Sequence, residues 1–119
     1  MDGRIFDLRD DLLRDLKHDW TVEEMAERAG LSVSHFPTVF KTHTHFSPGA
    51  YLKKIRLDSA KHLLETTHDH VDQIATKVGM PDESHFARDF KIAYNVTPTE
   101  YRRQFNDDLQ ANRENGEES

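Results

Sequence analysis

The 119-residue chain contains no cysteine and no long apolar run. Without cysteine it can form neither a disulfide framework, nor a thiolate zinc site, nor a cysteine nucleophile. No stretch approaches the roughly 18 consecutive apolar residues of a membrane-spanning helix. The opening residues, MDGRIFDLRDD, lack the basic region and apolar run of a signal peptide. These absences predict a soluble, cytoplasmic protein without a membrane partner, and 35% apolar residues suffice for a small globular domain.

The net charge of -6 is concentrated at the two ends of the chain. Residues 1–19 carry six acids and four bases, and residues 106–119 carry five acids and one base. Residues 20–105 carry eleven of each, so this part is neutral overall. The acidic total therefore does not exclude a polyanionic partner, because a neutral domain can still present one locally basic face.

A repeat of about fifty residues covers most of the chain. At an offset of 49, the first copy's Val22, Met25, Ala26 and Gly30 align with Val71, Ile74, Ala75 and Gly79. At an offset of 50, His35, Phe36, Phe40, Lys41, Pro48 and Tyr51 align with His85, Phe86, Phe90, Lys91, Pro98 and Tyr101. The second copy therefore has one extra residue just after its glycine, where a turn tolerates an insertion.

Each copy predicts two short helices joined by a turn. Thr21 and Glu24 have capping-box spacing, which predicts a helix from Val22. Gly30 can adopt the left-handed conformation that ends a helix, and Ser32 is a suitable N-cap for the next helix. Two such helices around a glycine-containing turn make a helix-turn-helix, and the second copy repeats the pattern.

The sequence therefore predicts an all-α fold in five segments. These are an N-terminal amphipathic helix or linker (1–19), a first helix-turn-helix (20–47), a long connecting helix (48–66), a second helix-turn-helix with a closing helix (67–105), and an acidic tail (106–119). The tail is polar throughout, so we expect it to fray or to be disordered.

Pro37 lies inside the helical pattern formed by Phe36, Val39 and Phe40. Proline removes a backbone donor and is tolerated only in the first turn of a helix. We therefore expect the second helix of the first copy to begin late, near His35, or to be distorted in its first turn.

The second copy carries the most specific motifs: Ile-Ala, Val-Gly, Ser-His-Phe, Arg-x-Phe-Lys and Thr-Pro-x-x-Tyr-Arg, all within residues 74–102. With RLDSAKHLL on the connecting helix, residues 20–105 resemble the DNA-binding domain of AraC-type transcriptional regulators. The resemblance implies two helix-turn-helix subdomains of about seven helices, besides the N-terminal amphipathic helix. It also implies that the two recognition helices enter successive major grooves of double-stranded DNA at an asymmetric promoter site.

The resemblance implies base contacts from the exposed face of each second helix. Carried over, these are Ser34, Pro37 and Thr38 in the first copy, and Glu83, Ser84, Ala87 and Arg88 in the second. Arg88 has the most to offer, because a guanidinium can bind guanine through two hydrogen bonds. The alternative for Arg88 is a solvated position or a pair with a nearby acid.

Basic residues of the neutral middle are candidates for phosphate contacts, although some can simply be solvated. They are Lys41, Lys53, Lys54, Arg56, Lys77, Lys91, Arg102 and Arg103.

Other features have a structural explanation. The phenylalanines have the i, i+4 spacing of a core, and His35 and His85 are better explained by packing or local hydrogen bonds than by catalysis. The histidines at 43–45 and 68–70 lack the further ligands of a metal site. We expect no enzyme and no cofactor, since no nucleophile with a base and no phosphate-binding loop can be assembled.

Two questions stay open at the level of sequence. The acidic ends and the modest first recognition helix leave room for a protein-interaction module with weak or no DNA affinity. An effector or dimerisation domain, usual in this family, has no room within 119 residues. The chain is therefore either a stand-alone regulator or an excised C-terminal domain, with RNA polymerase as a possible further partner.

Overall fold

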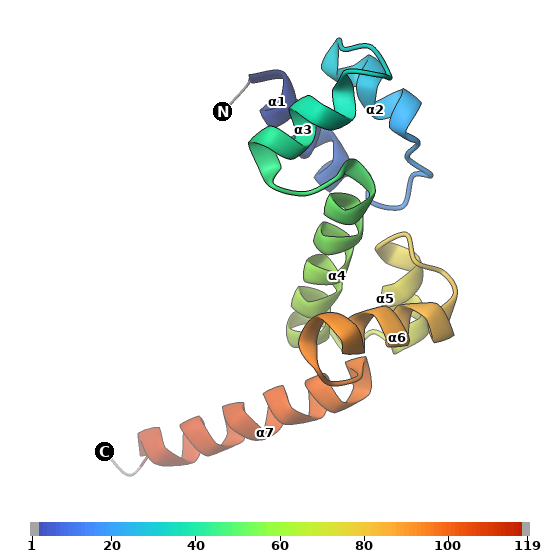
Figure 1. Cartoon of the computed structure of the whole chain (residues 1–119). Coiled ribbons are helices and arrows are strands. Elements are labelled where there is room, and N and C mark those ends of the chain that lie inside the picture. The colour runs from blue at the N-terminus through green and yellow to red at the C-terminus, as the bar shows by residue number, and fades with distance from the viewer. Residues whose placement is uncertain (1–2, 118–119) are drawn as a thin grey trace. The chain divides into compact units, whose positions relative to one another are not determined.

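The computed structural model describes the backbone of residues 3–117 and the side chains of residues 3–113. This part of the chain contains seven α-helices and no strand (Figure 1). The helices are α1 (Gly3–Arg14), α2 (Val22–Ala29), α3 (Phe36–Thr44), α4 (Pro48–Thr66), α5 (Val71–Lys77), α6 (Glu83–Tyr94) and α7 (Pro98–Glu117). The all-α prediction is confirmed, and the N-terminal amphipathic helix is one of the seven.

The chain divides into two compact units within α4. The first unit ends at Arg56 and the second begins at Leu57. The predicted connecting helix is thus a single element whose first half packs in the first unit and whose second half packs in the second.

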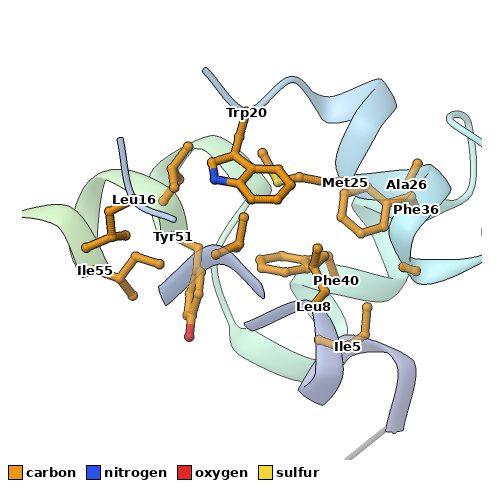
Figure 2. Close-up of a cluster of buried hydrophobic side chains, with 13 residues drawn as sticks. Ile5, Leu8, Leu16, Trp20, Met25, Ala26, Phe36, Phe40, Tyr51 and Ile55 are labelled. Atoms are coloured by element: carbon orange, nitrogen blue, oxygen red, sulfur yellow. The ribbon is translucent and has the colours of Figure 1, made fainter. Parts of the chain in front are cut away.

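The first unit has its own apolar core, built from one face each of α1, α2, α3 and the start of α4 (Figure 2). Phe36 and Phe40 are fully buried, and the Phe40 ring lies 5.2 Å from the ring of Tyr51. Trp20 is buried in this core, and its indole N–H donates to the Asp15 carbonyl at 2.8 Å. Burial of both phenylalanines confirms that they serve the core.

The second unit repeats this arrangement around Phe86 and Phe90, which are also fully buried. The Phe90 ring lies 4.7 Å from Tyr94 and 5.9 Å from Tyr101. Tyr101 corresponds to Tyr51 of the first copy, so the repeat in the sequence is a repeat of core packing.

The turns of the two units also match. Gly30 and Gly79 have φ of 69° and 83°, a left-handed conformation that glycine adopts without steric cost. Beyond each recognition helix, His45 and Asn95 both have φ of 68°, and their N–H groups donate to the carbonyls of Lys41 and Lys91. Each unit is therefore built with the same two left-handed helix ends.

One expectation about the C-terminus was wrong for the described residues. Residues 106–117 continue α7 as a helix, where the sequence predicted fraying or disorder. The Thr97 hydroxyl accepts from Glu100 N–H at 3.2 Å and starts this helix firmly, and no proline follows Pro98 to end it. Residues 118–119 of the predicted tail lie outside the described residues.

Candidate nucleic-acid interface

The second helix of the second unit, α6, separates a buried face from an exposed face. Its N-terminus is capped by Asp82, whose carboxylate accepts from His85 N–H at 3.0 Å. With Phe86 and Phe90 turned into the core, Glu83 and Arg88 lie on exposed positions. The structure thus leaves one side of α6 open to a ligand, as the sequence predicted for a recognition helix.

The four predicted base-contact residues of this unit lie on or beside that open side. Ser84 is exposed like Glu83 and Arg88, whereas Ala87 is half-buried. The pKa of the Asp82 carboxyl is held below its usual value, chiefly by the His85 N–H and to a smaller extent by the charge of Arg88. Arg88 therefore lies near an acid, yet its side chain stays exposed.

The corresponding helix of the first unit, α3, begins three residues later in its copy. Ser32 Oγ accepts from His35 N–H at 3.2 Å, and the Ser32 carbonyl accepts from Phe36 N–H at 2.9 Å. Residues 33–35 form a turn, and regular helix begins only at Phe36, with Pro37 in its first turn. The prediction of a late start near His35 is confirmed, because proline has no N–H to continue a regular ladder from Val33.

The predicted base-contact residues of α3 offer little polar chemistry. Ser34 lies in the turn before the helix, and its Oγ is 3.4 Å from Ser32 Oγ. Pro37 is half-buried and Thr38 is exposed. The first unit thus has no counterpart to the guanidinium of Arg88.

Three exposed residues on these helices escaped the sequence analysis. Val33 is 48% exposed in the turn before α3, and Ile92 is 74% exposed, one turn beyond Arg88 on α6. Thr42 of α3 occupies the position that Ile92 has in the second copy. For Thr42 and Ile92 the signal would have been their spacing of four residues from Thr38 and Arg88 along the helix; Val33, in the turn, has no such helical spacing from Ser34 or Thr38.

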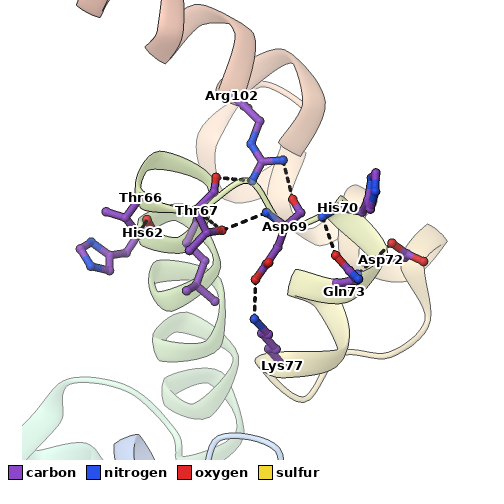
Figure 3. A network of polar contacts seen from close by, with 10 residues as sticks. His62, Thr66, Thr67, Asp69, His70, Asp72, Gln73, Lys77 and Arg102 are labelled. Atoms are coloured by element: carbon purple, nitrogen blue, oxygen red, sulfur yellow. Dashed lines mark hydrogen bonds and ion pairs between the residues drawn. The ribbon is translucent and has the colours of Figure 1, made fainter.

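Two of the eight predicted phosphate ligands are committed to the fold. Arg56 donates to the carbonyls of Leu16 and His18 at 3.0 and 2.8 Å, and its partial burial lowers its pKa. Arg102 donates to the carbonyls of Leu64, Thr67 and Asp69 (Figure 3). Each arginine holds the loop that precedes the first helix of its helix-turn-helix by these hydrogen bonds. We therefore no longer assign Arg56 and Arg102 to phosphate contacts.

A third candidate, Lys77, forms an ion pair with Asp69 in the same network (Figure 3). The other candidates, Lys41, Lys53, Lys54, Lys91 and Arg103, are exposed. The charges of Lys91 and Arg103 both lower the pKa of the Glu100 carboxyl, after the larger effect of its hydrogen bonds with Thr97. Lys91 at the end of α6 and Arg103 in the first turns of α7 therefore both lie within electrostatic reach of the Glu100 carboxylate.

Within residues 3–113, no group of three His, Asp or Glu side chains is arranged to hold a metal ion. One open hollow of about 720 Å³ is lined by Thr21, Glu23, Glu24, Glu27 and Arg28. No described helix combines the length and apolar character needed to cross a membrane.

Comparison with known proteins identifies the class. Residues 25–104 match a family described as a helix-turn-helix domain. An uncharacterized HTH-type transcriptional regulator of Haemophilus influenzae is 39% identical over 92 residues, which are 77% of this chain and 31% of that protein. The HTH-type regulator AlkR of Acinetobacter baylyi is 41% identical over 85 residues, which are 71% of this chain and 28% of AlkR.

A solved structure gives the same result. The DNA-binding domain of AdpA, a global transcriptional factor crystallised in complex with a target DNA, matches with a TM-score of 0.82 and 26% identity. The match covers 86% of this chain and 92% of the AdpA chain.

Two helix-turn-helix units, each with one side of its second helix exposed, form the architecture that helix-turn-helix DNA-binding domains use. The chain belongs to the AraC-type family of helix-turn-helix transcriptional regulators. The resemblance noted in the sequence is thereby confirmed. The chain spans about a third of the length of the two curated relatives.

Proposed function

We propose that the chain reads an asymmetric promoter site made of two different half-elements. α3 enters the major groove of one half-element, and α6 enters the next major groove, about one helical turn of roughly 34 Å away. The observation that supports this is the chemical difference between the two open faces. The open face of α6 carries the charged residues Glu83 and Arg88. The equivalent positions of the first copy are the neutral residues Val33 and Thr38.

In this proposal, Arg88 binds a guanine in the half-element of α6, with Glu83 accepting from a cytosine amine and Ser84 and Ala87 beside them. Ser34, Pro37 and Thr38 contact the other half-element. The phosphates are bound by Lys41, Lys53, Lys54, Lys77, Lys91 and Arg103, and backbone N–H groups at the start of α2 and α5 add contacts without side-chain charge.

We further propose that the chain acts in the cytoplasm as the DNA-reading part of a longer regulator. An effector or dimerisation domain would supply the signal, and RNA polymerase would receive it. The support is the length of the two relatives, each about three times the matched segment.

The test is selection of genomic or random fragments on the purified chain, followed by affinity measurements across salt. Six phosphate contacts predict that log Kobs falls against log salt with a slope of about −5. A complex that forms on selected DNA and weakens in this way supports the proposal. If no salt-sensitive complex forms near about 50 mM salt, the chain is instead a protein-interaction module on the same fold.

A further inference from the structure

The open face of α3 presents mostly methyl and methylene groups. Val33, in the turn that leads into α3, is 48% exposed. Pro37 contributes a ring with no N–H, and exposed Thr38 contributes a methyl group beside its hydroxyl. No lysine or arginine lies among these positions before Lys41, which is in the last turn.

Several polar groups of this face already have partners within the first unit. Thr42 Oγ1 donates to the Thr38 carbonyl at 2.8 Å, and Ser32 Oγ accepts from His35 N–H at 3.2 Å. Ser34 Oγ lies within 3.4 Å of Ser32 Oγ. The Thr42 hydroxyl has thus used its one donor, and the Ser32 hydroxyl already accepts one hydrogen bond, so this face has fewer hydrogen-bonding groups to offer than its sequence suggests.

The second unit has charged residues at the positions equivalent to Val33 and Thr38. Glu83 corresponds to Val33, and Arg88 corresponds to Thr38, at the offset of 50. Both charged side chains of α6 are thus replaced by neutral, methyl-bearing ones. The two units therefore differ in the kind of base edge that each can discriminate.

In the major groove only thymine presents a methyl group, and apolar side chains recognise it by contact. Resting on the proposed function, we propose that the half-element read by α3 is selected for thymines whose 5-methyl groups contact Val33, Pro37 and Thr38. The recognition in this half-element is by methyl contact, whereas the α6 half-element is read by charged hydrogen bonds.

The experiment uses the unmodified chain and its selected site. The half-element whose guanine preference disappears in Arg88→Ala belongs to α6, and the other belongs to α3. Each thymine of the α3 half-element is then replaced by deoxyuracil, which lacks only the 5-methyl group. We expect affinity to fall by about two- to fourfold per contacted thymine, as the loss of one buried methyl group requires.

The matched controls are deoxyuracil in the flanking DNA and the protein variants Val33→Ala and Thr38→Ser. Flanking deoxyuracil should leave affinity unchanged. Each variant is checked for an unchanged circular dichroism spectrum and melting temperature. Val33→Ala removes two γ-methyl groups and Thr38→Ser removes one, so each variant should become less sensitive to deoxyuracil at the thymine that its removed methyl groups contact. The result with the unmodified chain stands even if a variant does not fold.

Two results overturn the inference while the proposed function stands: a salt-sensitive complex that deoxyuracil leaves unchanged, and an α3 half-element selected without thymine. Failure to bind any fragment overturns the proposed function itself. The two failures are therefore distinguishable.

Discussion

Arg88 is exposed on the open side of α6. One turn of helix separates it from Ser84, and the residues between them, His85 to Ala87, include Phe86, which anchors α6 in the core. Because the helix beneath it is already fixed, binding to a base edge would order the Arg88 side chain but not the backbone that carries it. Arg88 is therefore the residue at which loss of discrimination should be largest.

Replacing Arg88 by alanine should cost about 1 to 3 kcal/mol of binding free energy at the selected site and relax the preference at one guanine position. The matched control is Arg103→Ala, also an exposed arginine, which should weaken all sequences alike and reduce the salt slope by about 1. Affinity measured on the selected site, on sites substituted at each base pair and across salt distinguishes the two. Uniform weakening by Arg88→Ala would place its guanidinium on a phosphate instead.

Among the helices, those whose ends are set by local side chains were predictable from sequence. Thr21 caps α2 by accepting from Glu24 N–H at 3.1 Å, and Thr97 and Glu100 form a capping box at the start of α7. The sequence could not predict the tertiary contacts of Arg56 and Arg102. Both arginines donate to backbone carbonyls that only the folded chain brings near them. Charge type identifies a basic residue, whereas only the fold shows whether its donors are already used.

For the candidate interface, the sequence predicted the exposed faces of α3 and α6 but not all of the residues that lie on them. The four-residue spacing of Phe36 and Phe40 on α3, and of Phe86 and Phe90 on α6, predicted which face of each helix is buried and hence which face is exposed. Val33 and Ile92 escaped because an aliphatic residue in a helical pattern is expected to be buried. Their exposure depends on how the helices pack against one another in each unit, which cannot be read from a short sequence motif.

The late start of α3 is attributable to Pro37, and replacing this residue tests the attribution. Pro37→Ser supplies an N–H that can donate to the Val33 carbonyl, worth about 0.5 to 1.5 kcal/mol, but it frees the unfolded chain by about 0.4 to 1 kcal/mol. We expect α3 to extend toward Val33, with a net gain of less than about 1 kcal/mol in unfolding free energy or a gain in DNA affinity.

Backbone chemical shifts and amide exchange of residues 33–35 measure the extension of this helix, and chemical denaturation measures its stability. Ala87→Ser at the corresponding position of the second copy is the control, because α6 already begins at Glu83 there. Unchanged shifts in Pro37→Ser, together with no gain in stability or affinity, would mean that the turn at 33–35 has another cause.

Across the whole molecule, the two units have separate cores joined by one helix. The buried residues form two clusters, one from Ile5 to Ile55 and the other from Leu57 to Phe90. Each unit carries one helix-turn-helix, and α4 contributes residues to both clusters. Such a division suits a protein that reads two unlike half-elements, since each core can support its own recognition helix.

This division predicts that each unit can be unfolded without the other. Phe40→Ala and Phe90→Ala remove corresponding, fully buried rings, each at a cost of about 3 to 5 kcal/mol. A unit of this size has a total stability of only about 3 to 9 kcal/mol. Phe40→Ala should therefore lose the buried fluorescence of Trp20, the only tryptophan, together with amide protection in α2 and α3, while α5 and α6 stay protected.

Phe90→Ala should do the reverse, with native Trp20 fluorescence and unprotected α5 and α6. Amide exchange followed by mass spectrometry on both variants separates the units, because α2 with α3 and α5 with α6 lie in different segments of the chain. Simultaneous loss of protection in both units in either variant would show that α4 couples the two cores into one cooperative structure. In that case a mutation in one recognition helix would weaken reading of both half-elements, and the two contributions to DNA affinity would not be additive.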